Sequence, residues 1–66
     1  MIRIKLDKLL EERGMSRYRL AQLTETKYQV IDNYYKNRVV RYDGEILSRI
    51  CAALDCNVGD ILEYEK

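Results

Sequence analysis

Hydrophobic residues recur at helical spacing along most of the chain, and polar stop signals divide them into short segments. Leu6, Leu9 and Leu10 fall at i, i+3 and i+4, the spacing of one helix face. Gly14 then supplies a C-terminal stop for that segment, because glycine readily takes the left-handed conformation that ends many helices. Read in this way, the pattern predicts helices over about 6–13, 17–23, 27–36 and 44–54, with a short fifth helix after Asn57.

Capping side chains precede three of these predicted helices. Ser16, Asp43 and Asn57 stand before the second, fourth and fifth helices, where a small polar side chain accepts a hydrogen bond from the free amides of the first turn. Asp60 follows Asn57 by three residues, which is the spacing of a capping box. Beyond the first helix, the residues expected to face the core are Leu20, Ala21, Thr24, Thr26, Ile31, Tyr34, Ile46, Leu47, Ile50, Cys51, Leu54, Val58, Ile61 and Leu62.

The first five residues do not follow the helical spacing. They alternate apolar and polar side chains, which fits either a short strand or an extended arm, and a strand there would pair with the C-terminal end of the chain. With 66 residues, no Pro and only three Gly, the chain is expected to form one domain over 1–66. The predicted fold class is all-α, a compact five-helix bundle with this short N-terminal strand or arm.

Charge is distributed unevenly although the net charge is only +1. Residues 17–41 hold six basic and two acidic side chains, a balance of +4, whereas residues 42–66 hold two basic and six acidic ones, a balance of −4. A basic middle and an acidic tail would turn one side of the molecule toward a polyanion. The alternative is that both stretches are ordinary solvated surface.

Several kinds of chemistry find no support in the sequence. There is no His, no Gly-rich phosphate loop and no nucleophile–base constellation, so no enzyme activity and no cofactor are expected. Cys51 and Cys56 without His do not complete a zinc site, and their spacing suits a reduced, cytoplasmic protein. No apolar run approaches the roughly 20 residues of a membrane span, and neither a signal peptide nor a small-molecule site is evident.

The segment 16–37 has the requirements of a helix-turn-helix. Two short predicted helices are joined by a tight turn, Ala21 is small enough to let them cross closely, and the second helix has a polar outward face. This segment resembles the helix-turn-helix of phage Cro and repressor proteins, the xenobiotic-response-element type of bacterial regulator. Residues 6–16 resemble that family's first helix and the cap of its second, and residues 50–62 resemble its last two helices. The resemblance covers roughly 6–64 and implies a sequence-specific transcriptional regulator, with repression as the expected role.

The chain departs from the family pattern at the turn. The family usually has Gly where Glu25 stands, an aliphatic residue where Thr26 stands, and Ser or Thr as helix cap where Lys27 stands. Glu25 is expected to adopt the left-handed conformation at a cost of about 1–2 kcal/mol. Thr26 is an alternative cap, which would move the start of the third helix by one residue.

The third helix is expected to enter the DNA major groove with its N-terminal end. Gln29 and Asn33 each carry a paired donor and acceptor that match adenine, and Asp32 would accept a hydrogen bond from the amino group of cytosine. Tyr28 offers a ring to a thymine methyl group. The residues expected to contact phosphates are Arg17, Lys27, Lys36, Asn37, Arg38 and Arg41.

The expected partner is double-stranded DNA with a two-fold operator. So small a domain contacts few bases, so useful affinity would require a homodimer. The predicted dimer surface uses the fifth helix and the end of the fourth, with Tyr64 and the N-terminal arm. An alternative function is a protein-interaction module or antitoxin-like component with the same fold, which a large exposed apolar patch would favour.

Overall fold

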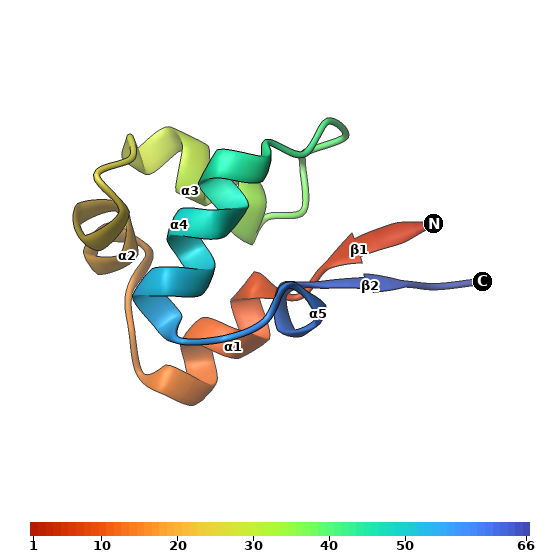
Figure 1. Ribbon diagram of the computed structural model, residues 1–66, viewed down its shortest axis with the longest axis horizontal. Coiled ribbons are helices and arrows are strands. Elements are labelled where there is room, and N and C mark those ends of the chain that lie inside the picture. The colour runs from red at the N-terminus through yellow and green to blue at the C-terminus, as the bar shows by residue number, and fades with distance from the viewer.

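Five short helices surround one buried apolar cluster, and two short strands extend side by side away from it with both termini at their ends (Figure 1). The computed structural model describes all residues from 1 to 66. In chain order the elements are β1 (Ile2–Ile4), α1 (Leu6–Arg13), α2 (Arg17–Thr24), α3 (Tyr28–Tyr35), α4 (Gly44–Leu54), α5 (Val58–Ile61) and β2 (Leu62–Tyr64). The predicted helical fold class is confirmed, with helix ends shifted by one residue in α2 and α3.

The core contains most of the residues that the helical spacing predicted. Its buried apolar members are Ile4, Leu6, Leu9, Leu10, Leu20, Ala21, Ile31, Tyr34, Leu47, Ile50, Leu54 and Ile61. Ile46, Cys51 and Leu62 are only partly buried and pack against this cluster. The placement of Val58 in the core was wrong, because this residue is 49% exposed at the start of the one-turn helix α5.

The two termini form an antiparallel sheet, which confirms the strand alternative for the N-terminal residues. Arg3 pairs with Glu63 in the centre of the register, and Ile4 pairs with Leu62 beside the core. The loop after α3 also holds β1, because the side-chain oxygen of Asn37 accepts a hydrogen bond of 3.1 Å from the amide of Ile4.

Helix caps follow the sequence at most positions but not at α3. Ser16 accepts a 3.0 Å bond from the amide of Arg19, and Asp43 accepts bonds from the first turn of α4. The residue at the N-cap of α3 is Lys27, and no side chain caps this helix. The alternative that Thr26 caps α3 was therefore wrong, because its hydroxyl instead donates to the carbonyl of Thr24 at 3.1 Å.

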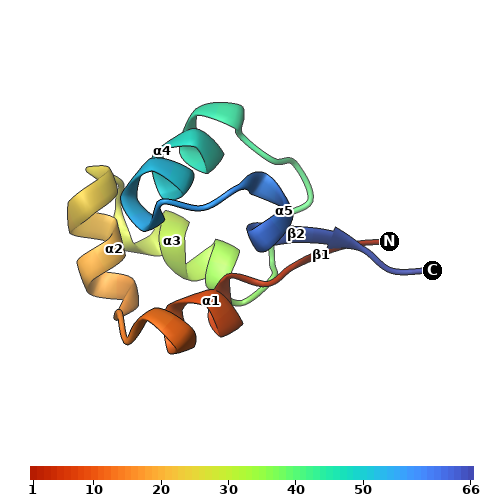
Figure 2. The same ribbon diagram turned by 60° about the horizontal axis from the view of Figure 1, so that its bottom comes forward.

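The turn between α2 and α3 has the predicted left-handed residue. Glu25 has a φ of 53° and a ψ of 39°, and its amide bonds to the carbonyl of Gln22 at 3.2 Å. A residue without glycine's freedom thus makes a turn that favours glycine. Ala21 lies in α2, and its small side chain is buried, which allows close packing of this helix. Helix α2 lies against both α3 and α4 (Figure 2).

Candidate nucleic-acid interface

Helix α3 has one buried face and one polar face. Ile31 and Tyr34 are buried in the core, and the Tyr34 hydroxyl accepts a 3.0 Å hydrogen bond from the amide of Asp43. That bond joins the C-terminal part of α3 to the N-cap residue of α4. Tyr28 and Gln29 at its N-terminal end are exposed, as the sequence predicted.

Two amide side chains on this polar face are already paired with each other. The side-chain nitrogen of Gln29 donates to the side-chain oxygen of Asn33 at 3.1 Å, one helical turn away. Each side chain loses rotamer freedom in this contact, while the Gln29 oxygen and the Asn33 nitrogen remain open to an external group. The pair therefore presents an acceptor and a donor side by side, the combination that an adenine edge requires.

Asp32 lies in a different environment from the one expected for a base-reading residue. The prediction that Asp32 lies on the polar outward face of α3 was wrong, because this residue is only 6% exposed. One carboxylate oxygen is 2.7 Å from the Arg17 guanidinium and the other is 3.0 Å from the Lys36 ammonium. Each carboxylate oxygen of Asp32 thus has a cationic partner within the chain, so the chemistry of this side chain is that of an internal ion pair.

The two cations determine the protonation of this carboxyl group. The hydrogen bond from Lys36 lowers the pKa of Asp32 below its usual value, and the bond from Arg17 lowers it further, while burial opposes both. Asp32 is thus a carboxylate throughout the neutral pH range. Arg17 is held from a second side, since its guanidinium lies 4.4 Å from the centre of the Tyr35 ring. Tyr35 thus packs on Arg17 of α2.

The remaining predicted phosphate contacts divide into free and engaged side chains. Lys27, Arg38 and Arg41 are exposed and form no ion pair within the chain. They lie at the start of α3 and in the loop that follows it. Asn37 is also exposed, but its oxygen is bonded to β1 and its φ is 59°, so this residue shapes the loop. Sequence reasoning missed this role.

Further contacts that position the interface were also missed. Arg13 at the end of α1 donates a hydrogen bond to the carbonyl of Leu54, the last residue of α4. The contact joins residues 41 positions apart, so no local pattern indicates it. The Asp32–Lys36 pair, in contrast, has the i, i+4 spacing of a helical ion pair and was detectable in the sequence.

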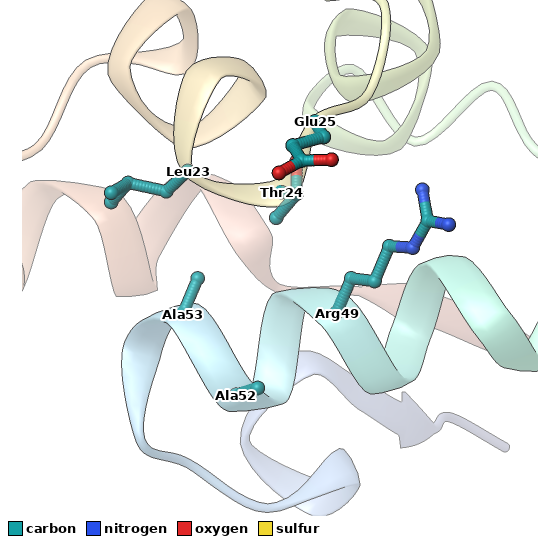
Figure 3. A pocket seen from close by; sticks show the side chains of 6 residues that line it. All are labelled: Leu23, Thr24, Glu25, Arg49, Ala52 and Ala53. Carbon is teal, nitrogen blue, oxygen red and sulfur yellow. The ribbon is translucent and has the colours of Figure 1, made fainter.

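No second chemical site competes with this face. A shallow hollow between the end of α2 and α4 is lined by Leu23, Thr24, Glu25, Arg49, Ala52 and Ala53 (Figure 3). These side chains include no nucleophile paired with a base and no metal-ligating group of three. Burial and the neighbouring Cys51 raise the pKa of the Cys56 thiol, which disfavours a nucleophilic thiolate. No helix is both long and apolar enough to span a bilayer.

Two packed helices joined by a tight turn, with a polar outward face on the second, define a helix-turn-helix protein. The chain belongs to the family of Cro/C1-type HTH DNA-binding domains, whose profile matches residues 5–66. It is 36% identical over 62 residues to YopS of Bacillus subtilis (strain 168), an SPbeta prophage-derived uncharacterized HTH-type transcriptional regulator. The match covers 91% of this chain and 81% of that relative. The predicted resemblance to phage-repressor-type regulators is thereby confirmed.

Proposed function

We propose that this chain is a sequence-specific regulator of transcription, a repressor that inserts α3 into the major groove of double-stranded DNA. The observation that carries the proposal is the polar face of α3, where the paired amide side chains of Gln29 and Asn33 are flanked by exposed cations that form no ion pair within the chain. Family membership supports DNA binding, and the relative's description supports a regulatory role. As a DNA-binding unit over 1–66, it would act in the cytoplasm without catalytic activity or a cofactor.

Base reading is assigned to three side chains of α3. Gln29 would contact adenine through its amide, Asn33 would orient Gln29 and contact a neighbouring base, and Tyr28 would pack on a thymine methyl group. All three lie in the first six residues of the helix, the end that enters the groove in this type of protein. Asp32 is withdrawn from the base-reading set because its carboxylate is buried and ion-paired.

Phosphate binding is assigned to cations on both sides of α3. Lys27 stands at its N-terminus, and Arg38 and Arg41 follow its C-terminus, so the free cations bracket the helix. Arg17 and Lys36 would join them from the Asp32 cluster, together with the side-chain amide nitrogen of Asn37. Because each phosphate contact releases counterions, such a set makes affinity steeply dependent on salt.

A homodimer on a two-fold operator is part of the proposal. Exposed apolar side chains at the sheet end of the molecule support a second copy as partner, and they include Met1, Ile2 and Tyr64. Val58 at α5 is exposed as well and supports the fifth helix as part of the same contact. Sedimentation equilibrium of the chain alone and with Tyr64→Lys tests this part, with weaker self-association expected for the variant.

Selection of bound duplexes from a random pool tests the function itself. We expect enrichment of a two-fold sequence whose half-sites are centred about 10 base pairs apart, one turn of DNA. The same selection with Gln29→Ala should lose enrichment at particular base pairs and retain the spacing. A pool that shows no enrichment over the input after repeated rounds would exclude sequence-specific binding.

A protein-interaction module is the second candidate, and one surface favours it. Val40 is 88% exposed and lines a hollow together with Met1, Ile2, Val39 and Tyr42. Exposed apolar surface of this kind often marks a protein contact. Val40→Ser distinguishes the two functions, because it removes the exposed apolar side chain without adding charge between Arg38 and Arg41. It should leave DNA selection unchanged and abolish association with a protein partner that docks there.

A further inference from the structure

We propose that Asp32 is a positioning residue that sets the discrimination between the operator and other DNA, by holding Arg17 and Lys36 in place and lowering their combined charge. The inference rests on the proposed DNA-binding function, which it deepens. In this inference Asp32 does not contact a base, and it influences DNA binding through Arg17 and Lys36.

The geometry fixes two cations from different elements around one anion. Arg17 is the first residue of α2, and Lys36 directly follows α3, so the carboxylate of Asp32 joins the two helices of the motif. The Asp32 side chain is only 8% exposed, whereas those of Arg17 and Lys36 are 34% and 42% exposed. The anion is therefore inside and the cations point outward, which leaves N–H groups of each cation available to a phosphate.

Restraint of Arg17 comes from two independent contacts. The ion pair to Asp32 holds one edge of the guanidinium, and the Tyr35 ring lies against its face. A planar guanidinium held in this way has one preferred direction for its remaining donors. Only a duplex seated with its backbone in that direction gains the full contact, which favours one register on the DNA.

The negative charge of Asp32 also affects the discrimination between the operator and other DNA. Two cations and one buried carboxylate give a cluster of net charge +1, where the two cations alone would have +2. Binding to arbitrary DNA depends chiefly on such charge. Asp32 thus weakens binding to every sequence, while the operator recovers the loss through contacts that require the fixed geometry.

Asp32→Asn tests the inference, with Glu63→Gln as the matched control. The control removes one negative charge and frees Lys5, its partner at 3.9 Å, in the terminal sheet away from α3. For folded Asp32→Asn we expect affinity for a scrambled duplex to rise about 3- to 10-fold at low salt, and the ratio of operator to scrambled affinity to fall at least about 3-fold. Glu63→Gln should change that ratio less than about 1.5-fold.

A second measurement does not depend on DNA. The carboxyl carbon of Asp32, followed by NMR during an acid titration, should report a pKa below the usual value, and Arg17→Gln or Lys36→Gln should each raise it. In the double variant Arg17→Gln/Lys36→Gln, addition of Asp32→Asn should alter the affinity ratio less than it does in the native chain, because both groups through which Asp32 acts are missing.

The outcomes separate this inference from the proposed function. A low, cation-dependent pKa with no operator selected from any pool overturns the proposed function and the role assigned to Asp32 together. Operator binding with an unchanged affinity ratio in Asp32→Asn overturns the inference alone, even if the melting temperature falls. A changed ratio that persists fully in the Arg17→Gln/Lys36→Gln background also overturns it, because Asp32 would then act directly on DNA.

Discussion

Residues 17–41 and residues 42–66 both contribute buried apolar helices to one core, but they use their charges in opposite ways. The first stretch is basic and the second acidic, by the same margin of four charges. In the acidic stretch most charges contact a group of the same chain. In the basic stretch several cations contact none. The comparison shows that two stretches of equal and opposite net charge differ in how much of that charge is paired within the fold.

The acidic side chains are largely satisfied within the fold. Glu63 and Glu65 pair with Lys5 and Arg3 across the terminal sheet, and Glu45 pairs with Arg49 along α4 at 2.8 Å. The remaining contacts are helix caps. Asp43 accepts hydrogen bonds from the first backbone amides of α4, and Asp60 accepts a hydrogen bond of 3.0 Å from the amide of Asn57. These groups stabilise helix starts and the sheet, and little of their charge is left for an external partner.

The basic side chains show the reverse. Arg17 and Lys36 share the single carboxylate of Asp32, while Lys27, Arg38 and Arg41 have no ionic partner. All of them lie in or beside the helix-turn-helix. These unpaired cations remain available to an external polyanion, as the proposed DNA-binding function requires.

The largest expected effect contrasts cations of the two stretches. Arg38→Ala combined with Arg41→Ala should weaken binding to every duplex by about 10- to 100-fold and make the dependence of log affinity on log salt shallower by about two units. Arg49→Ala removes a paired cation of α4 and should change neither quantity appreciably. Fluorescence anisotropy titrations at four salt concentrations measure both. Equal losses of affinity in the Arg38→Ala/Arg41→Ala variant and in Arg49→Ala would show that paired and unpaired cations contribute alike to DNA binding.

The second largest expected effect distinguishes base contacts from phosphate contacts within the basic stretch. Gln29→Ala should cost about 1–3 kcal/mol of binding free energy on the selected operator, since it removes the acceptor of the Gln29–Asn33 pair and releases Asn33 from its partner. The loss on a scrambled duplex should be much smaller, because phosphate contacts are unchanged. Equal losses on both duplexes would show that Gln29 reads no base.

A smaller effect is expected from a cap in the acidic stretch. Asp43→Ala removes the acceptor for the first amides of α4 and should lower the free energy of unfolding by about 1 kcal/mol. Operator affinity measured well below the melting temperature should stay the same. Thermal and urea unfolding give the stability change. A large loss of affinity in the folded variant would mean that the acidic stretch takes part in DNA contact.

The smallest effect concerns the turn that joins α2 to α3. Glu25→Gly should raise the free energy of unfolding by up to about 1 kcal/mol, because the positive φ at this residue strains any side chain with a Cβ. Gly14→Ala, at another C-cap with positive φ, is the opposite change and should destabilise the chain by a similar amount. A lower melting temperature for Glu25→Gly would point to a stabilising contact of the Glu25 side chain.

Local sequence patterns predicted the elements well because their causes are local. Helical spacing, the caps Ser16 and Asp43, and the stop at Gly14 each depend on neighbours within about one helical turn. The left-handed turn at Glu25 was also predicted, although from the family resemblance. Thr26 failed as a cap for a similar local reason, since its hydroxyl found a nearer acceptor in the carbonyl of Thr24.

The candidate site was predicted only in part. The exposed positions of Lys27, Tyr28 and Gln29 followed from the period of α3, and the structure agrees with them. Asp32 shares that polar face by sequence position, yet it is buried, because Arg17 of another helix and Lys36 converge on its carboxylate. A periodicity argument treats a charged side chain as solvated, and it has no means of finding a cation 15 residues away.

The sequence by itself determined the helix boundaries to within one residue, most of the apolar core and the family, because spacing, caps and turn chemistry act over a few residues. Tertiary structure alone decided which polar groups that are distant in the sequence contact one another. It joined Asp32 to Arg17, Asn37 to the amide of Ile4, and Arg13 to the carbonyl of Leu54. Ion pairs and hydrogen bonds require groups to lie within about 3–4 Å, and only the folded chain brings such distant positions together.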